Sequence, residues 1–291
     1  MKAMEESFEE LQKKYGIKPD VLDTDEIGEL VKPLKGRPGL TRWLMRRLCV
    51  DKVNWLHRHN YRTPGAPFAA GLLKDLDITL RIDNEQVLDS LPQGAFVTIS
   101  NHPFGALDGI ALIHMIASRR PAFKVIVNMV LNHITAMRPN FIAVDQQASD
   151  DPARKAVSMQ GIKEAIMQVR RGEPIGMFPA GAMSKIDYGK GYLIDREWQP
   201  AMIRLIRQLK VPVIPIYFHG RNSFIFDLLG RTLWQLRTVR LPSEVFRKAH
   251  TTIHVTVGDP ISVEEQSRHQ ESVEAFGDFL REKTYALRTW K

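Results

Sequence analysis

The sequence predicts an α/β domain with a mixed sheet flanked by helices, preceded by a small helical N-terminal module. Short β-type runs alternate with helical runs after about residue 75, which is typical of a layered α/β fold. Before that point the apolar spacing is helical only. A chain of 291 residues with 44% hydrophobic content also buries a substantial core. We therefore predict a module at residues 1–75 and one sheet domain at residues 76–291.

The predicted module begins with an acidic stretch. Residues 1–31 hold four Lys against nine Asp or Glu, a net charge of −5. Phe8, Leu11 and Tyr15 lie on one side of a helix over residues 5–15. Asp25 is expected to cap a second, short helix over residues 27–32.

The rest of the predicted module is basic and amphipathic. From Lys35 to Arg62, eight Lys or Arg stand against one Asp. Residues 40–61 have the apolar period of one helix, with Thr41 as its N-cap, and the Pro and Gly residues at 64–67 mark a hinge. We expect this helix to lie at a membrane interface. The side chains predicted near lipid are Trp43, Leu44 and Trp55, and those predicted near headgroups are Arg42, Arg46, Arg47 and Arg58.

The predicted sheet domain contains seven apolar runs of strand length separated by helical patterns. The strands are expected at residues 77–82, 94–100, 123–128, 141–144, 174–178, 211–218 and 252–258. Helices are expected at residues 109–118, 153–171, 199–209 and 264–287.

The charge and the cysteine content limit the classes of function. The chain carries +8 overall, but residues after 31 carry +13, from 37 basic against 24 acidic side chains. That balance indicates an anionic partner, which is a phospholipid surface, an acidic acyl carrier or nucleic acid. Charge alone motivates the nucleic-acid partner, and no nucleic-acid-binding motif supports it. The single cysteine, Cys49, permits neither an internal disulfide nor a thiolate metal site, and a reducing, cytoplasmic setting fits.

No signal peptide and no apolar run of about 18 residues are apparent, so we expect membrane contact to be peripheral. The sequence also lacks the GxSxG, GxxxxGK[ST], HExxH and GxGxxG motifs. Other common catalytic and nucleotide-binding chemistries therefore fit it poorly.

The most informative segment is residues 96–116, where an apolar strand ends in Asn-His-Pro-Phe-Gly and an Asp opens an apolar helix. The imidazole of His102 is a suitable base near pH 7, and a carboxylate beside it can fix its tautomer. On a straight helix His102 and Asp108 would point about 240° apart and could not meet. A turn through Pro103 and Gly105 can bring them together. Alternatively, His102 is a core or capping histidine and Asp108 only caps the helix, although capping does not exclude pairing.

With these residues the sequence resembles the lysophospholipid acyltransferase superfamily. That family has a His and an Asp separated by four residues, then an F-P-E-G-T-R-S block and a V-P-V-x-P strand. Here residues 101–108 (NHPFGALD) match the His–Asp motif with one extra residue between the two. Residues 178–184 (FPAGAMS) match the F-P-E-G-T-R-S block, and residues 211–215 (VPVIP) match the V-P-V-x-P strand. Residues 141–145 (FIAVD) stand where a further block is expected. The resemblance covers about residues 76–265.

Where the sequence departs from these family motifs, it resembles the hemolysin-related branch of the family. That branch includes acyltransferases that make ornithine lipids and other amino-acid lipids. Ala180 and Met183 replace the family's Glu and Arg, and that Arg is associated with an acceptor phosphate. A glycerol-phosphate acceptor is therefore in doubt. Lys185, Arg221 or Lys190 would be substitute anion contacts, and a solvated surface charge is the alternative for each.

The resemblance implies a site in which His102 and Asp108 are catalytic. N–H groups around residues 178–181 would bind a thioester oxyanion or a phosphate, unless this is an ordinary exit from a strand. Asn101 would contact the substrate or, alternatively, orient the loop. We interpret His219 as structural. The substrate-binding candidates are Asn101, Gly105, Phe178, Pro179, Gly181, Ser184, Lys185 and Arg221.

The implied reaction is direct transfer of a fatty acyl group from acyl-CoA or an acyl carrier protein onto the hydroxyl of a lysolipid. No metal, cofactor or covalent enzyme intermediate is expected. A lyso-amino-acid lipid such as lyso-ornithine lipid is favoured over lysophosphatidate. A peripheral lipid-binding protein without catalysis is the alternative of another class. The expected location is the cytoplasmic face of the inner membrane.

Overall fold

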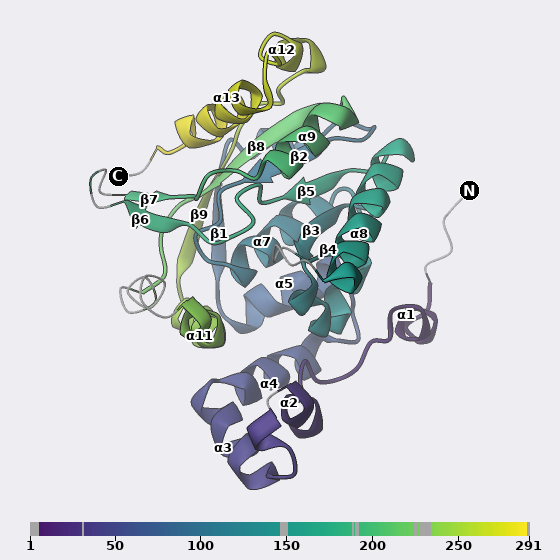
Figure 1. Cartoon of the computed structure of the whole chain (residues 1–291), viewed down its shortest axis with the longest axis vertical. Coiled ribbons are helices and arrows are strands. Elements are labelled where there is room, and N and C mark those ends of the chain that lie inside the picture. Colours follow the sequence, from purple (N-terminus) through teal and green to yellow (C-terminus); the bar gives the residue numbers. More distant parts are fainter. Residues whose placement is uncertain are drawn as a thin grey trace.

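The computed structural model describes residues 6–30, 32–145, 151–187, 189, 192–223, 226 and 234–289. The chain begins with a helical module made of α1 (Phe8–Tyr15), α2 (Thr24–Leu30), the 3₁₀ helix η1 (Lys32–Leu34), α3 (Pro38–Arg47) and α4 (Val50–Asn60). The helices α2, α3 and α4 lie at one end of the molecule, whereas α1 lies beside the sheet domain, with Phe8, Leu11 and Tyr15 packed against its core (Figure 1). The module is followed by α5 (Ala66–Asp75).

The described sheet domain contains a mixed sheet of seven strands in the order β1-β9-β8-β2-β5-β3-β4. All neighbours are parallel except β8 and β9, so β1 and β9 run against the other strands. The seven predicted strands and the predicted fold class are therefore confirmed. The strands are β1 (Thr79–Asp83), β2 (Val97–Ser100), β3 (Lys124–Asn128), β4 (Phe141–Val144), β5 (Ile175–Met177), β8 (Val213–Phe218) and β9 (Thr252–Val257).

Further elements connect these strands. The helices are α6 (Gln86–Asp89), α7 (Ala106–Ala117), α8 (Pro152–Arg170), α9 (Pro200–Leu209), α11 (Trp234–Arg247), α12 (Val263–Ser267) and α13 (Val273–Ala286). Two 3₁₀ helices, η2 (Met129–His133) and η3 (Thr135–Asn140), link β3 to β4. A separate hairpin is formed by β6 (Lys185–Asp187) and β7 (Tyr192–Ile194), which pair antiparallel.

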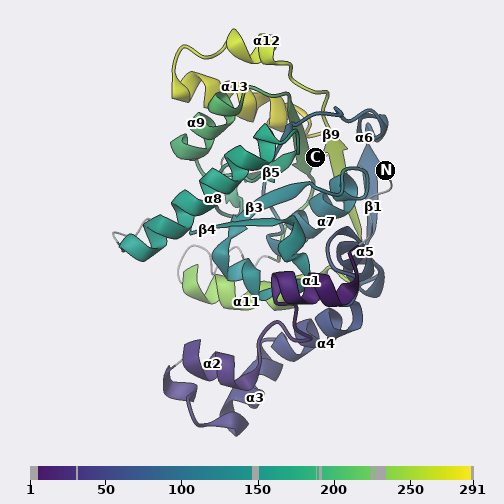
Figure 2. The same ribbon diagram turned by 90° about the vertical axis from the view of Figure 1, so that its right-hand side faces the viewer.

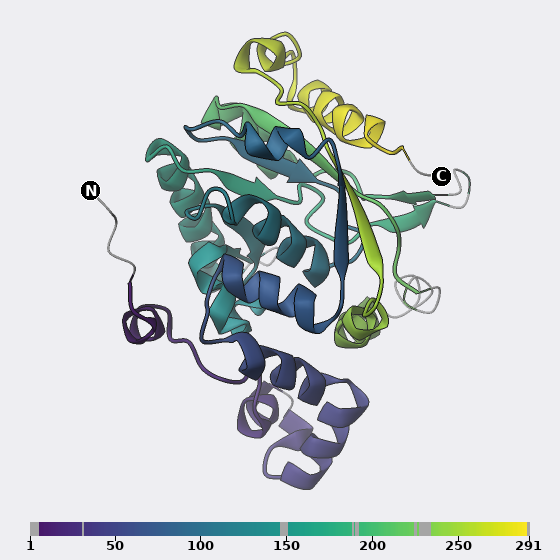
Figure 3. The same ribbon diagram turned by 180° about the vertical axis from the view of Figure 1, so that it is seen from behind.

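Each face of the sheet has its own hydrophobic core because successive side chains of a strand point to opposite faces. In β8, Ile214 and Ile216 pack with α5 and α7, whereas Val213 packs on the other face. Figures 2 and 3 show the two coverings, with α8, α9 and α13 on one face and α5 and α7 on the other. The central strands are consequently buried on both sides, which explains their continuous apolar runs.

The single helix predicted over residues 40–61 is wrong. The chain breaks at Cys49, which has a left-handed φ of 59°, and α3 and α4 lie on either side of it. The break lets α3 pack on α2, so that Met45 joins Ile27 and Leu34 in a small separate core. Thr41 lies inside α3 rather than at its cap, and its buried hydroxyl donates to the Arg37 carbonyl at 3.0 Å.

Three other predicted boundaries also differ. Asp23, not Asp25, caps α2, because its carboxylate accepts the N–H groups of residues 25 and 26. The predicted hinge is the start of α5, where Pro67 fits because first-turn N–H groups have no helical partner. Residues 264–287 form two helices, since Ser272 caps α13 by accepting from the Ala275 N–H at 3.0 Å.

The predicted domain boundary at residue 75 stays a prediction. The helix α5 packs its Phe68 and Leu72 in the core of the sheet domain beside Leu107 of α7. Over the described residues, none of the helices combines the length and the apolar character needed to cross a bilayer.

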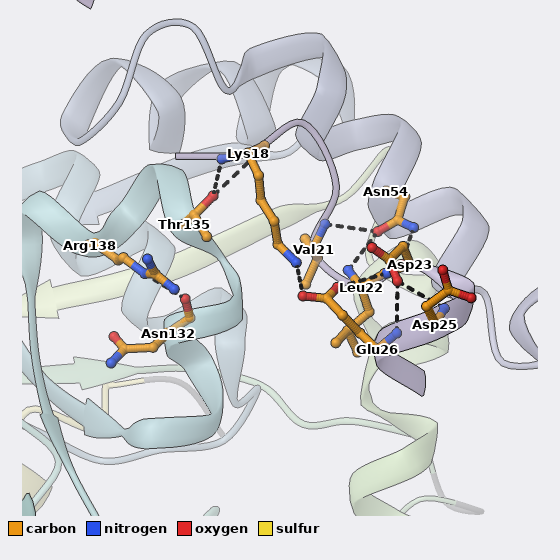
Figure 4. Close-up of polar contacts among 10 residues, drawn as sticks. All are labelled: Lys18, Val21, Leu22, Asp23, Asp25, Glu26, Asn54, Asn132, Thr135 and Arg138. Atoms are coloured by element: carbon orange, nitrogen blue, oxygen red, sulfur yellow. Dashed lines mark hydrogen bonds and ion pairs between the residues drawn. The ribbon is translucent and has the colours of Figure 1, made fainter. Parts of the chain in front are cut away.

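Polar contacts hold the start of the chain against the rest of the structure (Figure 4). The Lys18 N–H donates to the Thr135 hydroxyl of η3 at 3.0 Å, and the Arg138 guanidinium donates to the Tyr15 carbonyl at 2.6 Å. Asn54 of α4, which is 6% exposed, accepts from the N–H groups of Val21 and Leu22 at 3.0 and 3.2 Å. Its amide also donates to the Leu22 carbonyl at 2.7 Å.

We predict that Asn54→Ala lowers the free energy of unfolding by about 1–3 kcal/mol, because two main-chain N–H groups lose their acceptor. Urea denaturation measures the change. Asn132→Ala is the matched control, since Asn132 contacts Arg138 through its main-chain carbonyl. Equal stability of the two variants would contradict the role assigned to Asn54.

Candidate active site

The site is built on the turn between β2 and α7. His102 follows the carboxyl end of β2, where parallel α/β sheets commonly bind their ligands. Gly105 opens α7 with a φ of 77°, and a Cβ there would lie 2.9 Å from atoms of Met183 and Leu241. The backbone conformation therefore favours glycine at this position, whereas the crowding involves side-chain ends that can move.

Asp108 binds this turn and faces the histidine. Its carboxylate is fully buried, and Oδ2 accepts the N–H groups of Phe104 at 2.8 Å and Gly105 at 3.0 Å. The same oxygen lies 2.9 Å from Nδ1 of His102. The helix cap and the His–Asp pair are therefore made by one side chain. Burial raises the pKa of Asp108, and its contacts with the imidazole and the two N–H groups oppose that rise.

The imidazole of His102 contacts Phe178 with one face of its ring and Asp108 with one edge. Its ring stacks on Phe178 with 4.2 Å between the ring centroids, and its side chain is 20% exposed. The separation from Asp108 is that of a hydrogen bond, although the ring is rotated off the ideal line. Such contacts commonly tighten when substrate binds. With Nδ1 turned to the carboxylate, Nε2 is the nitrogen left to accept a proton.

An apolar cavity of about 80 Å³ adjoins the imidazole. Its lining comes from the turn between β2 and α7, from α7 itself, from β3, β4 and the two 3₁₀ helices between them, and from the block after β5. The lining side chains are mostly aliphatic or aromatic and include Ile110, Val127, Leu131, Met137 and Phe141. Together with His102 they provide an apolar wall next to a base.

The predicted substrate-binding residues divide into two groups. Gly105, Phe178 and Gly181 line the cavity. Asn101 is 1% exposed, and its amide binds the main chain of Phe218 at 2.7 and 2.9 Å, which fits the alternative that it orients the loop. Ser184 is 2% exposed and its hydroxyl donates to Asp195 at 2.6 Å, so its contacts are internal.

The predicted oxyanion-binding segment is an ordered turn. The Gly181 N–H donates to the Phe178 carbonyl at 2.9 Å, and the buried Pro179 accepts from the Gln199 N–H at 2.9 Å. The Gly181 N–H is thus already used within the turn.

Neither Lys185 nor Arg221 lines the cavity. Both are exposed, Lys185 at the start of β6 and Arg221 after β8. Lys190 lies outside the described residues. His219 is 9% exposed and its Nε2 lies 2.8 Å from the Thr256 hydroxyl, while burial lowers its pKa to about 4. This environment fits the structural interpretation of His219.

Two charged groups near the site carry no signal in the sequence. Asp195 follows β7 and lies within 3.3 Å of the His102 N–H, and no motif includes it. Lys248 lies 4.9 Å above the Phe104 ring and donates to the Arg221 carbonyl at 2.5 Å. Burial lowers the pKa of Lys248. Only the tertiary fold brings these residues to the turn between β2 and α7.

Among the described residues, no cluster of three or more His, Cys, Asp or Glu is arranged to hold a metal ion.

Comparison with known proteins adds to this geometry. A sequence model of the acyltransferase family matches residues 27–290. The lyso-glycine lipid O-acyltransferase of Bacteroides thetaiotaomicron is 28% identical over 222 residues, which cover 72% of this chain and 76% of that protein. The lyso-glycine lipid O-acyltransferase of Phocaeicola vulgatus is 25% identical over 222 residues, 72% and 74% of the two chains.

A solved structure, the 1-acyl-sn-glycerophosphate acyltransferase PlsC of Thermotoga maritima, covers 86% of this chain and 89% of its own at 12% identity, with a TM-score of 0.49. The family match includes the catalytic turn, the cavity walls and the block after β5. The chain therefore belongs to the acyltransferase family and is an enzyme that transfers acyl groups.

Proposed function

We propose that His102 and Asp108 are the catalytic pair of an acyl transfer from acyl-CoA or an acyl carrier protein to the hydroxyl of a lysolipid. The observation that carries the proposal is the position of the imidazole. It lies 2.9 Å from a fully buried carboxylate and lines a small apolar cavity. A base that is paired with a carboxylate and faces an apolar wall supports proton transfer from an acceptor hydroxyl.

The proposed reaction is a direct displacement. Nε2 of His102 takes the proton of the acceptor hydroxyl while its oxygen attacks the thioester carbonyl. The tetrahedral intermediate then expels the thiolate, which takes the proton from the imidazolium. Asp108 stabilises that imidazolium and keeps Nδ1 directed away from the substrate. Membership of an acyltransferase family favours this reaction over the alternative of a lipid-binding protein without catalysis.

We propose a lyso-amino-acid lipid as the acceptor, with lysophosphatidate as the alternative. Both curated relatives are named for a lyso-glycine lipid, which carries an amino-acid headgroup. A phosphate monoester carries nearly two negative charges and is commonly bound by a forked guanidinium. The block after β5 has Met183 where the family has that Arg, between Ala182 and Ser184. This substitution supports the amino-acid lipid.

We further propose that α3 and α4 contact an anionic membrane surface. Trp43 and Trp55 are 61% and 58% exposed, and Arg46 and Arg47 are exposed beside them in the sequence. Large exposed apolar side chains next to basic ones are typical of an interfacial helix.

Two of the side chains predicted at that surface are engaged within the protein. Leu44 packs on the small core around Met45, because α3 folds back on α2. Arg58 pairs with Asp20 at 2.6 Å. The proposed contact therefore rests on the two tryptophans and the arginines of α3. The cytoplasmic face of the inner membrane remains our proposal for its location.

We predict that His102→Ala lowers turnover roughly 10²- to 10⁴-fold, because no other base lies on this motif. Asp108→Asn should lower it severely as well, since the imidazolium loses its counter-charge. Thiol release from a long-chain acyl-CoA with lyso-glycine lipid as acceptor measures both. Thermal unfolding of each variant verifies that it is folded. Near-normal turnover by folded His102→Ala would refute the catalytic assignment.

We predict that the double variant Arg46→Glu, Arg47→Glu binds anionic vesicles at least roughly 30-fold less tightly, because two attractions are lost and two repulsions are added. Each basic side chain near such a surface contributes about 1 kcal/mol. Flotation with phosphatidylglycerol vesicles measures the change. Lys163→Glu, Arg170→Glu on α8 changes the net charge equally and is the matched control. Equal losses in the two double variants would show that total charge, rather than α3, governs binding.

We predict that lyso-glycine lipid is acylated faster than lysophosphatidate when the two compete at equal concentration. Mass spectrometry of the two products gives the ratio. Arg221→Ala should leave that ratio nearly unchanged, because Arg221 does not line the cavity. A preference for lysophosphatidate that disappears in the variant would overturn this prediction and identify Arg221 as a phosphate contact.

A further inference from the structure

A second buried carboxylate lies behind the catalytic histidine. Asp195 stands between β7 and α9 and is 3% exposed. Its Oδ1 lies 3.3 Å from the His102 N–H and accepts the Ser184 hydroxyl at 2.6 Å. Its Oδ2 accepts the Trp198 indole N–H at 3.2 Å. The proposed reaction gives this group no task.

These contacts fix the main chain of His102 on both sides. The His102 N–H is shared between Oδ1 of Asp195 and the Ser184 hydroxyl oxygen, at 3.3 Å from each. The His102 carbonyl accepts the Ser184 N–H at 2.9 Å. The base is therefore anchored to the block after β5 through its backbone, independently of Asp108 and Phe178.

Asp195 is itself held by the C-terminal helix. Its N–H donates to the Tyr285 hydroxyl at 2.7 Å, and its carbonyl accepts from the Arg281 guanidinium at 3.0 Å. Both partners belong to α13. A continuous set of hydrogen bonds thus runs from α13 through Asp195 and Ser184 to the catalytic turn.

Burying a carboxylate in this position costs free energy of desolvation. Burial raises the pKa of Asp195, and the hydrogen bonds from Ser184 and Trp198 oppose that rise. An apolar side chain of similar size would avoid the desolvation penalty. Catalytic groups, however, must be placed within a fraction of an ångström, and neighbours that lock them achieve this.

We propose that Asp195 is a positioning residue, which fixes the main chain of His102 for acyl transfer both directly and together with Ser184. This inference rests on the proposed function, because it requires His102 to be the base. Ser184 then serves the same purpose through its hydroxyl and does not contact substrate.

The test compares Asp195→Ala with two matched variants, using the full chain, a long-chain acyl-CoA and lyso-glycine lipid. Asp195→Ala removes one of the two acceptors of the His102 N–H and also the acceptor of the Ser184 hydroxyl, so kcat should fall roughly 10- to 100-fold while KM for both substrates changes little. Asp195→Asn keeps one acceptor oxygen for Ser184 and His102 and should retain more of kcat. Trp198→Phe removes only the indole donor on the far oxygen and should stay within about threefold of wild type.

Thermal unfolding separates positioning from stability. In Asp195→Asn, the amide NH₂ would face the Trp198 indole N–H, so two donors would oppose each other. In Trp198→Phe, the indole hydrogen bond is lost. Both variants should therefore have a lower melting temperature than the wild type. If kcat follows the melting temperature across the three variants, Asp195 is merely structural and the proposal is overturned. A rise in KM without loss of kcat would overturn it as well.

Two controls keep the outcome decisive. If Asp195→Ala does not fold, Ser184→Ala carries the test, since it removes the second acceptor of the His102 N–H and the hydroxyl that donates to Asp195. It should lower kcat without changing KM, and a wild-type kcat would refute the proposal. Active His102→Ala would refute the proposed function itself. Inactive His102→Ala with fully active Asp195→Ala would refute only the role of Asp195.

Discussion

The turn between β2 and α7 closes on itself because one carboxylate oxygen of Asp108 accepts two consecutive main-chain N–H groups, those of Phe104 and Gly105. That oxygen lies 2.9 Å from Nδ1 of His102, so the interaction that starts the helix also orients the base. Gly105 makes the geometry possible with its positive φ, and Asn101 fastens the other end of the turn to β8. The site depends on this local closure more than on any single long-range contact.

The rest of the sheet gives the turn its surroundings. The strand β5 lies beside β2 and delivers Phe178 onto the imidazole, while β3 and the two 3₁₀ helices supply the apolar wall opposite α7. The low polarity of this cavity strengthens the electrostatic contact between His102 and Asp108 at its edge.

Much of the fold was predictable because its strands are short apolar runs separated by clear breaks, and all seven were found. The His102–Asp108 pair was predictable because its residues are close in sequence and flank a Pro-Gly turn. The break at Cys49 between α3 and α4 was not predictable from local sequence, because it is stabilised by the burial of Met45 against Ile27, which is a tertiary contact. The helix α11 was not predicted, and it contains Pro242 in its interior, where proline is unfavourable. Asp195 and Lys248 reach the catalytic turn only through the packing of distant elements, and neither belongs to a sequence motif.

The two 3₁₀ helices connect the helical module to the site. Ile134 and Met137 of this segment line the cavity, and Thr135 between them binds the main chain of Lys18. Arg138, one residue further, binds the carbonyl of Tyr15 at the end of α1. The segment that follows β3 is therefore shared between the cavity wall and the anchor of the module.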